Sequence, residues 1–204
     1  MKLRTSATRP VVNLALLLCA MLLWPSPAAA QAQFIVKPVT EKKIKVLPAG
    51  PLYWHIKNFP TLAQAQGAAG PTSLAAEVSG KVWLFTLSPA GASTRGGSKG
   101  RRDWPLAANH GTRIFTADQP RIRPPGAKTP VHTHPGSEAF YVLAGRLGQK
   151  TPHGVSHADA GQSMNGHGAD TPMEVFSAGT TDLDQLVMFV VDATRPFSSP
   201  AKFD

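Results

Sequence analysis

The amino-acid sequence predicts an all-β fold, a sandwich or a barrel built from short strands. No long stretch shows helical spacing, and residues 61–69 alone predict a short helix. No internal repeat is visible, so the chain predicts one β domain rather than two in tandem. Six short runs rich in β-branched and aromatic residues are separated by Gly, Pro and Ser, which is typical of strands: residues 52–59, 82–87, 113–116, 138–143, 173–176 and 186–191.

Two of these runs differ from the others because they are apolar on both faces. Residues 82–87 and 186–191 show no alternation between apolar and polar positions. A strand with two apolar faces has no side that favours water. We therefore expect both runs either between two layers of the fold or at a subunit contact, which leaves a homodimer open.

The first 30 residues predict a secretory signal. Three basic residues precede a largely apolar stretch over residues 11–24, and small residues lead up to Ala30. The apolar stretch is shorter than the roughly 20 residues of a membrane span, so we expect no stable membrane insertion. Cleavage after Ala30 or Ala32 would leave a periplasmic or secreted protein. Within it, residues 31–105 would supply N-terminal strands and a Gly-rich basic loop, 106–195 the barrel core, and 196–204 a tail.

Cysteine content and net charge limit the possible metal-ligand atoms and the possible binding partners. Cys19, the sole cysteine, lies in the predicted signal, so any metal must be held by nitrogen and oxygen. The net charge of +9 falls to +6 when the three basic residues of the signal are removed. Much of the excess lies in residues 95–128, a field that would attract anions. We expect a small-molecule ligand, with anionic metabolites among the candidates. Export and the lack of interleaved aromatic residues argue against nucleic acid.

The most informative segment is Gly126 to Gly145. It holds His132, His134 and Glu138 at the start of an apolar, β-branched and aromatic run. Histidines at i and i+2 share one side of a strand, because side chains alternate between faces. Glu138 returns to that side if extended backbone resumes after the turn at 135–137. Two imidazoles and one carboxylate suit a divalent transition metal such as Fe, Mn, Ni or Zn.

This segment resembles the first motif of the cupins. The matching positions are Gly126, His132, His134, Glu138 and Gly145, with the family's spacing between them. The resemblance implies a single cupin-type jelly-roll β-barrel with N-terminal and C-terminal extensions. It also implies that His132, His134 and Glu138 face a lumen that holds a metal. The match covers 20 of the 204 residues, so the rest of the chain needs its own argument.

The second cupin motif departs from the family pattern. Counting from Gly161 without gaps puts Pro172 where the family has a third histidine, and proline has no side-chain donor. A shifted loop would let His167 act as the missing ligand. The site would otherwise use His132, His134 and Glu138 alone, or would have lost its metal. Glu174 shares strand parity with Pro172 and would face the lumen if Pro172 does.

Two classes of function follow from this site. In the first, an exported cupin-barrel protein binds a divalent metal or a small ligand, or both, through the His-x-His-x3-Glu residues. In the second, a non-haem iron or manganese dioxygenase or isomerase acts on a small molecule. The sequence does not decide whether the protein is an enzyme, because function depends on the site rather than on the fold. Metal occupancy should fall below about pH 6, as histidine protonates.

Overall fold

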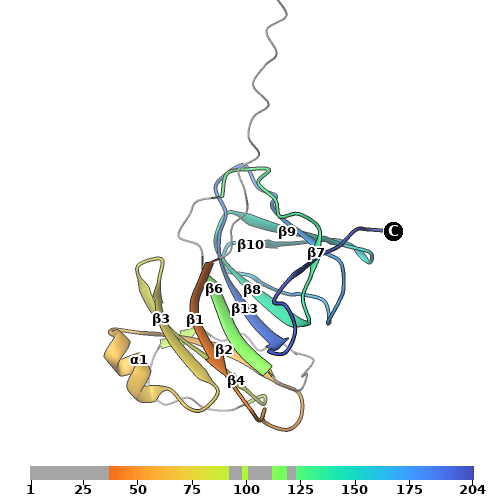
Figure 1. Cartoon of the computed structure of the whole chain (residues 1–204). Coiled ribbons are helices and arrows are strands. Elements are labelled where there is room, and N and C mark those ends of the chain that lie inside the picture. Colours follow the sequence, from red (N-terminus) through yellow and green to blue (C-terminus); the bar gives the residue numbers. More distant parts are fainter. Residues whose placement is uncertain (1–36, 92–97, 101–111, 119–122) are drawn as a thin grey trace, which may run out of the picture. The chain divides into compact units, whose positions relative to one another are not determined.

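A computed structural model describes residues 37–91, 98–100, 112–118 and 123–204 (Figure 1). The described residues belong to one compact unit. The predicted signal sequence, residues 1–30, lies outside the described residues. The described elements are one helix, α1 (Leu62–Ala68), and the strands β1 (Lys37–Lys43), β2 (Tyr53–Phe59), β3 (Ser73–Val78), β4 (Lys81–Ser88), β5 (Ser98–Gly100), β6 (Thr112–Asp118), β7 (His132–Thr133), β8 (Gly136–Ala144), β9 (Arg146–Thr151), β10 (Gly154–Asp159), β11 (Ser163–Asn165), β12 (Glu174–Ser177), β13 (Asp184–Asp192) and β14 (Ser199–Pro200).

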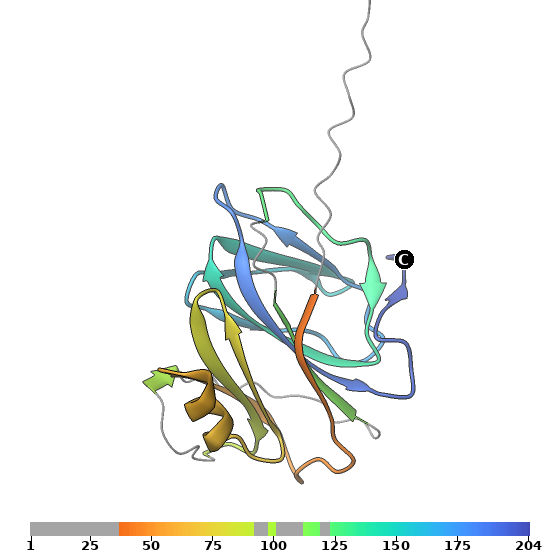
Figure 2. The ribbon, with the colours of Figure 1, turned by 60° about the vertical axis from the view of Figure 1, so that its left-hand side comes forward.

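The strands form four antiparallel sheets, which confirms the predicted all-β class. A five-stranded sheet has the order β1-β6-β13-β8-β11, and a three-stranded sheet has the order β10-β9-β12. A two-stranded sheet pairs β14 with β7, and a four-stranded sheet has the order β3-β4-β2-β5. All strand pairs within the sheets are antiparallel. Figures 1 and 2 show the sheets from two directions.

The five-stranded and three-stranded sheets face each other across one apolar core. This core is formed by side chains that alternate inward along β8, β9, β10, β12 and β13. Its buried members are Phe140, Val142, Leu147, Ala158, Val175, Leu183, Val187, Phe189 and Val191. Burial of both inner faces produces the jelly-roll barrel that the resemblance to the cupins implies.

A second core covers the outer face of the five-stranded sheet. Leu186, Met188 and Val190 project from β13 into this core, while the residues between them project into the barrel. The four-stranded sheet supplies the other side, with the largest fully buried side chains Trp54 and Phe85. The expectation that residues 186–191 lie between two layers is therefore confirmed.

The short helix forms where the sequence predicts it. The Thr61 side chain caps α1 by accepting a hydrogen bond from the backbone N–H of Gln64 at 3.2 Å. Ala65 is fully buried, and α1 contacts β2, β3 and β4. In the part of the chain that the structure describes, no helix is long and apolar enough to cross a membrane.

The C-terminal residues belong to the barrel wall. Strand β14 pairs with β7, with Ser199 opposite Thr133 and Pro200 opposite His132. The backbone N–H of Ala201 also donates to the carbonyl of Val131 at 3.0 Å. The predicted tail over 196–204 thus reaches the histidine-bearing strand. The Gly-rich basic loop predicted over residues 88–105 has only residues 88–91 and 98–100 within the described ranges, and the rest of it lies outside them.

Candidate metal centre and ligand pocket

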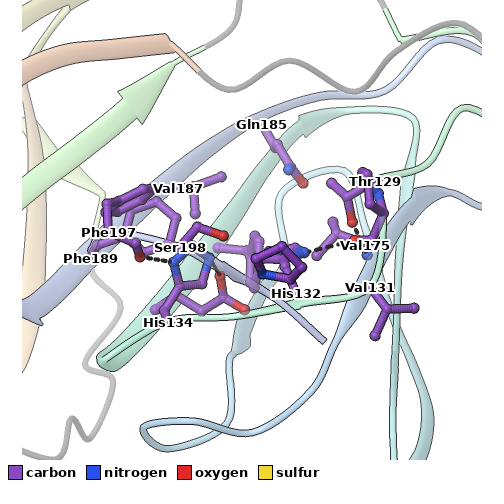
Figure 3. A pocket seen from close by; sticks show the side chains of 14 residues that line it. Thr129, Val131, His132, His134, Val175, Gln185, Val187, Phe189, Phe197 and Ser198 are labelled. Carbon is purple, nitrogen blue, oxygen red and sulfur yellow. Dashed lines mark hydrogen bonds and ion pairs between the residues drawn. The ribbon is translucent and has the colours of Figure 1, made fainter. Parts of the chain in front are cut away.

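Three side chains from adjoining segments line one cavity. His132 lies in β7, His134 follows that strand, and Glu138 is the third residue of β8. The backbone of His132 exchanges hydrogen bonds with that of Met173, at 3.0 and 2.8 Å, which fixes the strand against the opposite wall. All three side chains line the cavity shown in Figure 3.

Both histidines are oriented by backbone carbonyls. The Nδ1 of His132 lies 2.8 Å from the carbonyl oxygen of Pro130, and the Nδ1 of His134 lies 2.7 Å from that of Phe197. A carbonyl oxygen only accepts, so each Nδ1 donates and carries the proton of the neutral ring. The lone pair is then left on each Nε2. Metal-binding histidines show this same second hydrogen bond, so the imidazoles fit a metal site.

Glu138 has a buried carboxyl group that accepts one side-chain hydrogen bond. Its side chain is 2% exposed, and the Nε2 of Gln149 donates to its Oε1 at 2.6 Å. Burial raises the pKa of Glu138 to about 8, against the opposing effect of the Gln149 hydrogen bond. The carboxyl group is therefore mostly protonated at neutral pH, unless a cation reaches it. A buried carboxyl with no cationic partner is a good match for a metal ion.

His134 and Glu138 face each other without forming an ion pair. Burial lowers the pKa of His134 to about 4, although the Phe197 carbonyl acts in the opposite direction and His132 acts in the same one. Both groups are thus neutral near pH 7. The Nε2 of His134 lies 3.9 Å from the Oε2 of Glu138, too far for a hydrogen bond. Two donors about 2.0–2.2 Å from one ion lie at most about 4.4 Å apart, and about 3.4 Å apart in tetrahedral geometry, so these two side chains would draw slightly closer to share a metal.

The role of His132 as a metal ligand stays a prediction. Its ring centre lies 4.9 Å from that of His134, with the two rings nearly perpendicular. Burial lowers the pKa of His132 and keeps it neutral, although the Pro130 carbonyl acts in the opposite direction. Across the described ranges, no three His, Cys, Asp or Glu side chains are grouped closely enough to hold an ion.

The opposite wall of the barrel corrects one expectation. Met173 and Val175 of this wall are buried, whereas Glu174 between them pairs with Lys128 at 3.0 Å in a partly exposed position. Glu174 therefore does not face the lumen, because strand alternation turns it away from Met173 and Val175. Met173 is the inward residue opposite His132, and its Sδ lies 3.6 Å from the Nε2 of Gln149.

His167 lies apart from the other candidate ligands. It does not line the cavity of His132 and His134, and its ring stacks on that of His153 with centres 5.4 Å apart. The Nδ1 of His167 is buried without a hydrogen-bond partner. Burial lowers its pKa, and His153 adds to that effect.

The cavity beside the candidate metal centre is largely apolar. Its volume is about 330 Å³, at the lower end of the range for small-molecule pockets. Gln185 and Thr129 are buried polar residues of its lining. Its apolar walls come from Val131, Phe140, Val175, Val187, Phe189, Phe197, Pro130 and Pro200.

Sequence reasoning missed three residues of this site. Phe197 acts through its backbone carbonyl, which leaves no signal in the sequence. Gln149 lies in the polar run of β9, where nothing distinguishes it. Gln185 did leave a signal, because it shares strand parity with Val187 and Phe189 within an otherwise apolar face.

The backbone at Gly166 approaches the Glu138 side chain closely. The N–H of Gly166 donates to the carbonyl of Glu138 at 2.9 Å, and a Cβ at residue 166 would overlap the Cγ of Glu138. We expect Gly166→Ala to displace that carboxyl group and to cost about 1–3 kcal/mol of stability. Gly168→Ala is the matched control, because a Cβ there has no neighbour within 4 Å. Urea unfolding of both variants checks this, and equal midpoints would contradict it.

Comparisons with known proteins found similarity only among solved structures. No family model matches the chain, and no curated protein matches it. A protein with a double-stranded beta-helix domain from Klebsiella pneumoniae is 17% identical, with 48% of this chain and 83% of that chain covered and a TM-score of 0.36. A cupin 2 domain-containing protein from Halorhodospira halophila is 15% identical, with coverage of 45% and 57% and a TM-score of 0.34. Oxalate decarboxylase from Bacillus subtilis is 14% identical, with coverage of 44% and 24% and a TM-score of 0.35. Similarities of this size say nothing about the activity of this chain.

Proposed function

We infer that this cupin-type barrel protein binds a small molecule in its lumen beside a divalent transition metal. The barrel and the motif from Gly126 to Gly145 define the fold, and the site carries the function. The observation that carries the proposal is the arrangement of His134 and Glu138. Both side chains are buried and neutral, and both line a cavity of ligand size. The Nε2 of His134 lies 3.9 Å from the Oε2 of Glu138, too far for a hydrogen bond.

The residues that would hold the metal are His132, His134 and Glu138. The two carbonyls that accept from Nδ1 hold the imidazole rings in the tautomer that a metal requires. Gln149 holds one carboxyl oxygen of Glu138 and leaves the other toward His134. A bound divalent ion would act as a Lewis acid toward an oxygen of the ligand. Apolar walls from β8, β12 and β13 would exclude water from the rest of the ligand.

Metal-to-protein stoichiometry tests this proposal. We expect about one divalent ion per wild-type chain after equilibration with Fe²⁺ or Mn²⁺ under anaerobic conditions, and little or none in His134→Ala or Glu138→Ala. His167→Ala should retain the ion, because His167 lies outside the cavity lining. His157→Ala, at an exposed position of β10, is the control for loss of any histidine. Absence of metal from the wild type would overturn the metal part of the proposal.

An enzyme is the second candidate, and one observation favours it. The cavity opens directly onto His132, His134 and Glu138, so a bound molecule would lie next to any ion held there. A non-haem iron or manganese dioxygenase or isomerase would use such an arrangement. The deciding measurement is whether a molecule that binds in the cavity is recovered unchanged after incubation with metal-loaded protein and air.

We further propose that the protein acts after export, in the periplasm or outside the cell. The basic, apolar and small-residue stretches of residues 1–30 support this. N-terminal sequencing of protein from the cell envelope should begin at Gln31 or Gln33. An intact Met1 on protein from the cytoplasm would contradict it.

A further inference from the structure

Gln185 is a wholly buried polar side chain that points into the apolar cavity. It shares the inner face of β13 with Val187 and Phe189, and its exposed fraction is 0%. Neither its Oε1 nor its Nε2 has a hydrogen-bond partner. In Figure 3 the amide end of Gln185 is directed toward the cavity. The side chain therefore presents a free donor and a free acceptor to whatever enters the cavity.

An unpaired amide at this position lowers stability. Buried polar groups in folded proteins nearly always have a hydrogen-bond partner, since burial without one forfeits the hydrogen bonds to water. A leucine would fill the same space on the apolar face beside Val187 without that penalty. The glutamine is thus best explained by a ligand that pairs with it.

The strand register places Gln185 at the far end of the cavity from the candidate metal centre. On the neighbouring strand β8, Gln185 lies opposite Val142, whereas Phe189 lies opposite Glu138. Four residues of a strand span about 13 Å. Between the two ends the lining is apolar, with Phe140 and Val187 facing each other. A ligand that reaches both ends would have an apolar body and a polar group at each end.

The lining also restricts the charge of the polar group that meets Gln185. No Lys or Arg side chain is among the described residues that line the cavity. A carboxylate could accept from Nε2, but it has no proton to donate to Oε1, which would stay unpaired. A carboxamide or lactam instead offers one N–H to Oε1 and one carbonyl to Nε2.

We propose that Gln185 selects the ligand of this cavity, and that the ligand is an uncharged, largely apolar molecule carrying a carboxamide or lactam group. The inference deepens the proposed function, on whose lumen-bound ligand it rests. It differs from the anionic metabolite that the basic segment 95–128 suggests. Arg123 and Lys128 are the basic residues of that segment whose side chains the structure describes, and neither lines the cavity.

The test uses benzamide, benzoate and toluene as probes of one ring size. Binding is measured by titration in solution on metal-free, chelator-treated full-length protein. We expect wild type to bind benzamide at least about tenfold more tightly than benzoate, and Gln185→Leu to lose at least about tenfold of that affinity while binding toluene at least as well. Gln64→Leu, at an exposed position of α1, is the matched control and should bind like wild type.

A second measurement does not depend on any probe. Without ligand, Gln185→Leu should melt at least about 2 °C above wild type, because it removes an unpaired buried amide. A lower melting temperature would show that the amide is satisfied within the protein and would overturn the proposal. So would undetectable benzamide binding by wild type, or equal affinities for wild type and Gln185→Leu. The binding and melting measurements need no metal. A negative result in them is therefore distinguishable from a negative result in the metal-binding experiment.

Discussion

Gly136→Ala is expected to unfold the protein or to cost at least about 3 kcal/mol of stability, at or beyond the upper end of ordinary overpacking. Gly136 begins β8 and lies opposite Val191 of β13. A Cβ at this position would overlap the carbonyl oxygen of Val190 and lie 2.7 Å from the Cα of Val191. Both are backbone atoms, so no side-chain rotation relieves the overlap. The strands would have to separate between the two buried cores.

Chemical unfolding monitored by circular dichroism measures this loss. Gly168→Ala is again the control, because it adds the same methyl group where no atom lies within 4 Å. If Gly136→Ala fails to fold while Gly168→Ala behaves like wild type, the expectation is met. A Gly136→Ala midpoint equal to that of wild type would contradict the close pairing of β8 and β13. The site should fail with the fold, because Gly136 lies two residues from both His134 and Glu138.

Metal affinity is expected to rise about tenfold for each pH unit up to about pH 8. A metal binds the ionised carboxylate, and burial raises the pKa of Glu138 to about 8, so one proton must leave as the metal enters. Between pH 5 and pH 8 the affinity should therefore change about 1,000-fold, since each pKa unit corresponds to a factor of ten. Titration with Mn²⁺ at several pH values measures it. If the affinity for Mn²⁺ does not change over this pH range, Glu138 is already ionised in the metal-free protein.

The same proton makes the metal-free protein less stable as pH rises. The unfolded chain releases the Glu138 proton near its ordinary pKa of 4.5, whereas the folded protein holds it to about pH 8. The folded state thus binds more protons between these values, and stability falls with rising pH. Burial lowers the pKa of His134 from 6.5 to about 4, so His134 makes stability rise with pH. This contribution is confined to pH values below 6.5. Glu138 therefore governs the window from pH 6.5 to 8.

Over that window the loss should be roughly 2 kcal/mol, at about 1.4 kcal/mol per pH unit. Glu138→Gln has no proton to lose and should keep a constant stability over the same window. Denaturant unfolding of chelator-treated protein at pH 6.5 and pH 8 compares the two. A parallel decline in both proteins would assign the effect to another group.

The sequence predicted the strands that are apolar and missed those that are polar. Runs such as 52–59 and 186–191 have the side chains that strands favour, and both are strands in the structure. Strand β1 has the sequence KPVTEKK and β9 has RLGQKT, which show no apolar alternation. These segments are extended because neighbouring strands pair with them, and pairing between distant segments is not visible in a local pattern.

The candidate site was predictable only where its residues are close in sequence. The motif supplied His132, His134 and Glu138, but their partners come from strands and loops far along the chain. The pH dependence of metal binding shows the consequence. The sequence led us to expect histidine protonation below about pH 6 to limit metal binding, whereas burial lowers the pKa of His134 and raises that of Glu138, so the carboxyl group is the one that titrates. Burial depends on the whole fold.

The second core has a consequence for how copies of this protein could assemble. The outer face of β8 and β13, with Ala139, Leu186, Met188 and Val190, is apolar and would attract a matching surface if it were bare. Here the chain's own four-stranded sheet occupies that face through Trp54 and Phe85. A second copy therefore cannot dock on it. If the protein forms a homodimer, the two copies must meet through a different surface, and the barrel without its N-terminal strands would be prone to associate through this exposed face.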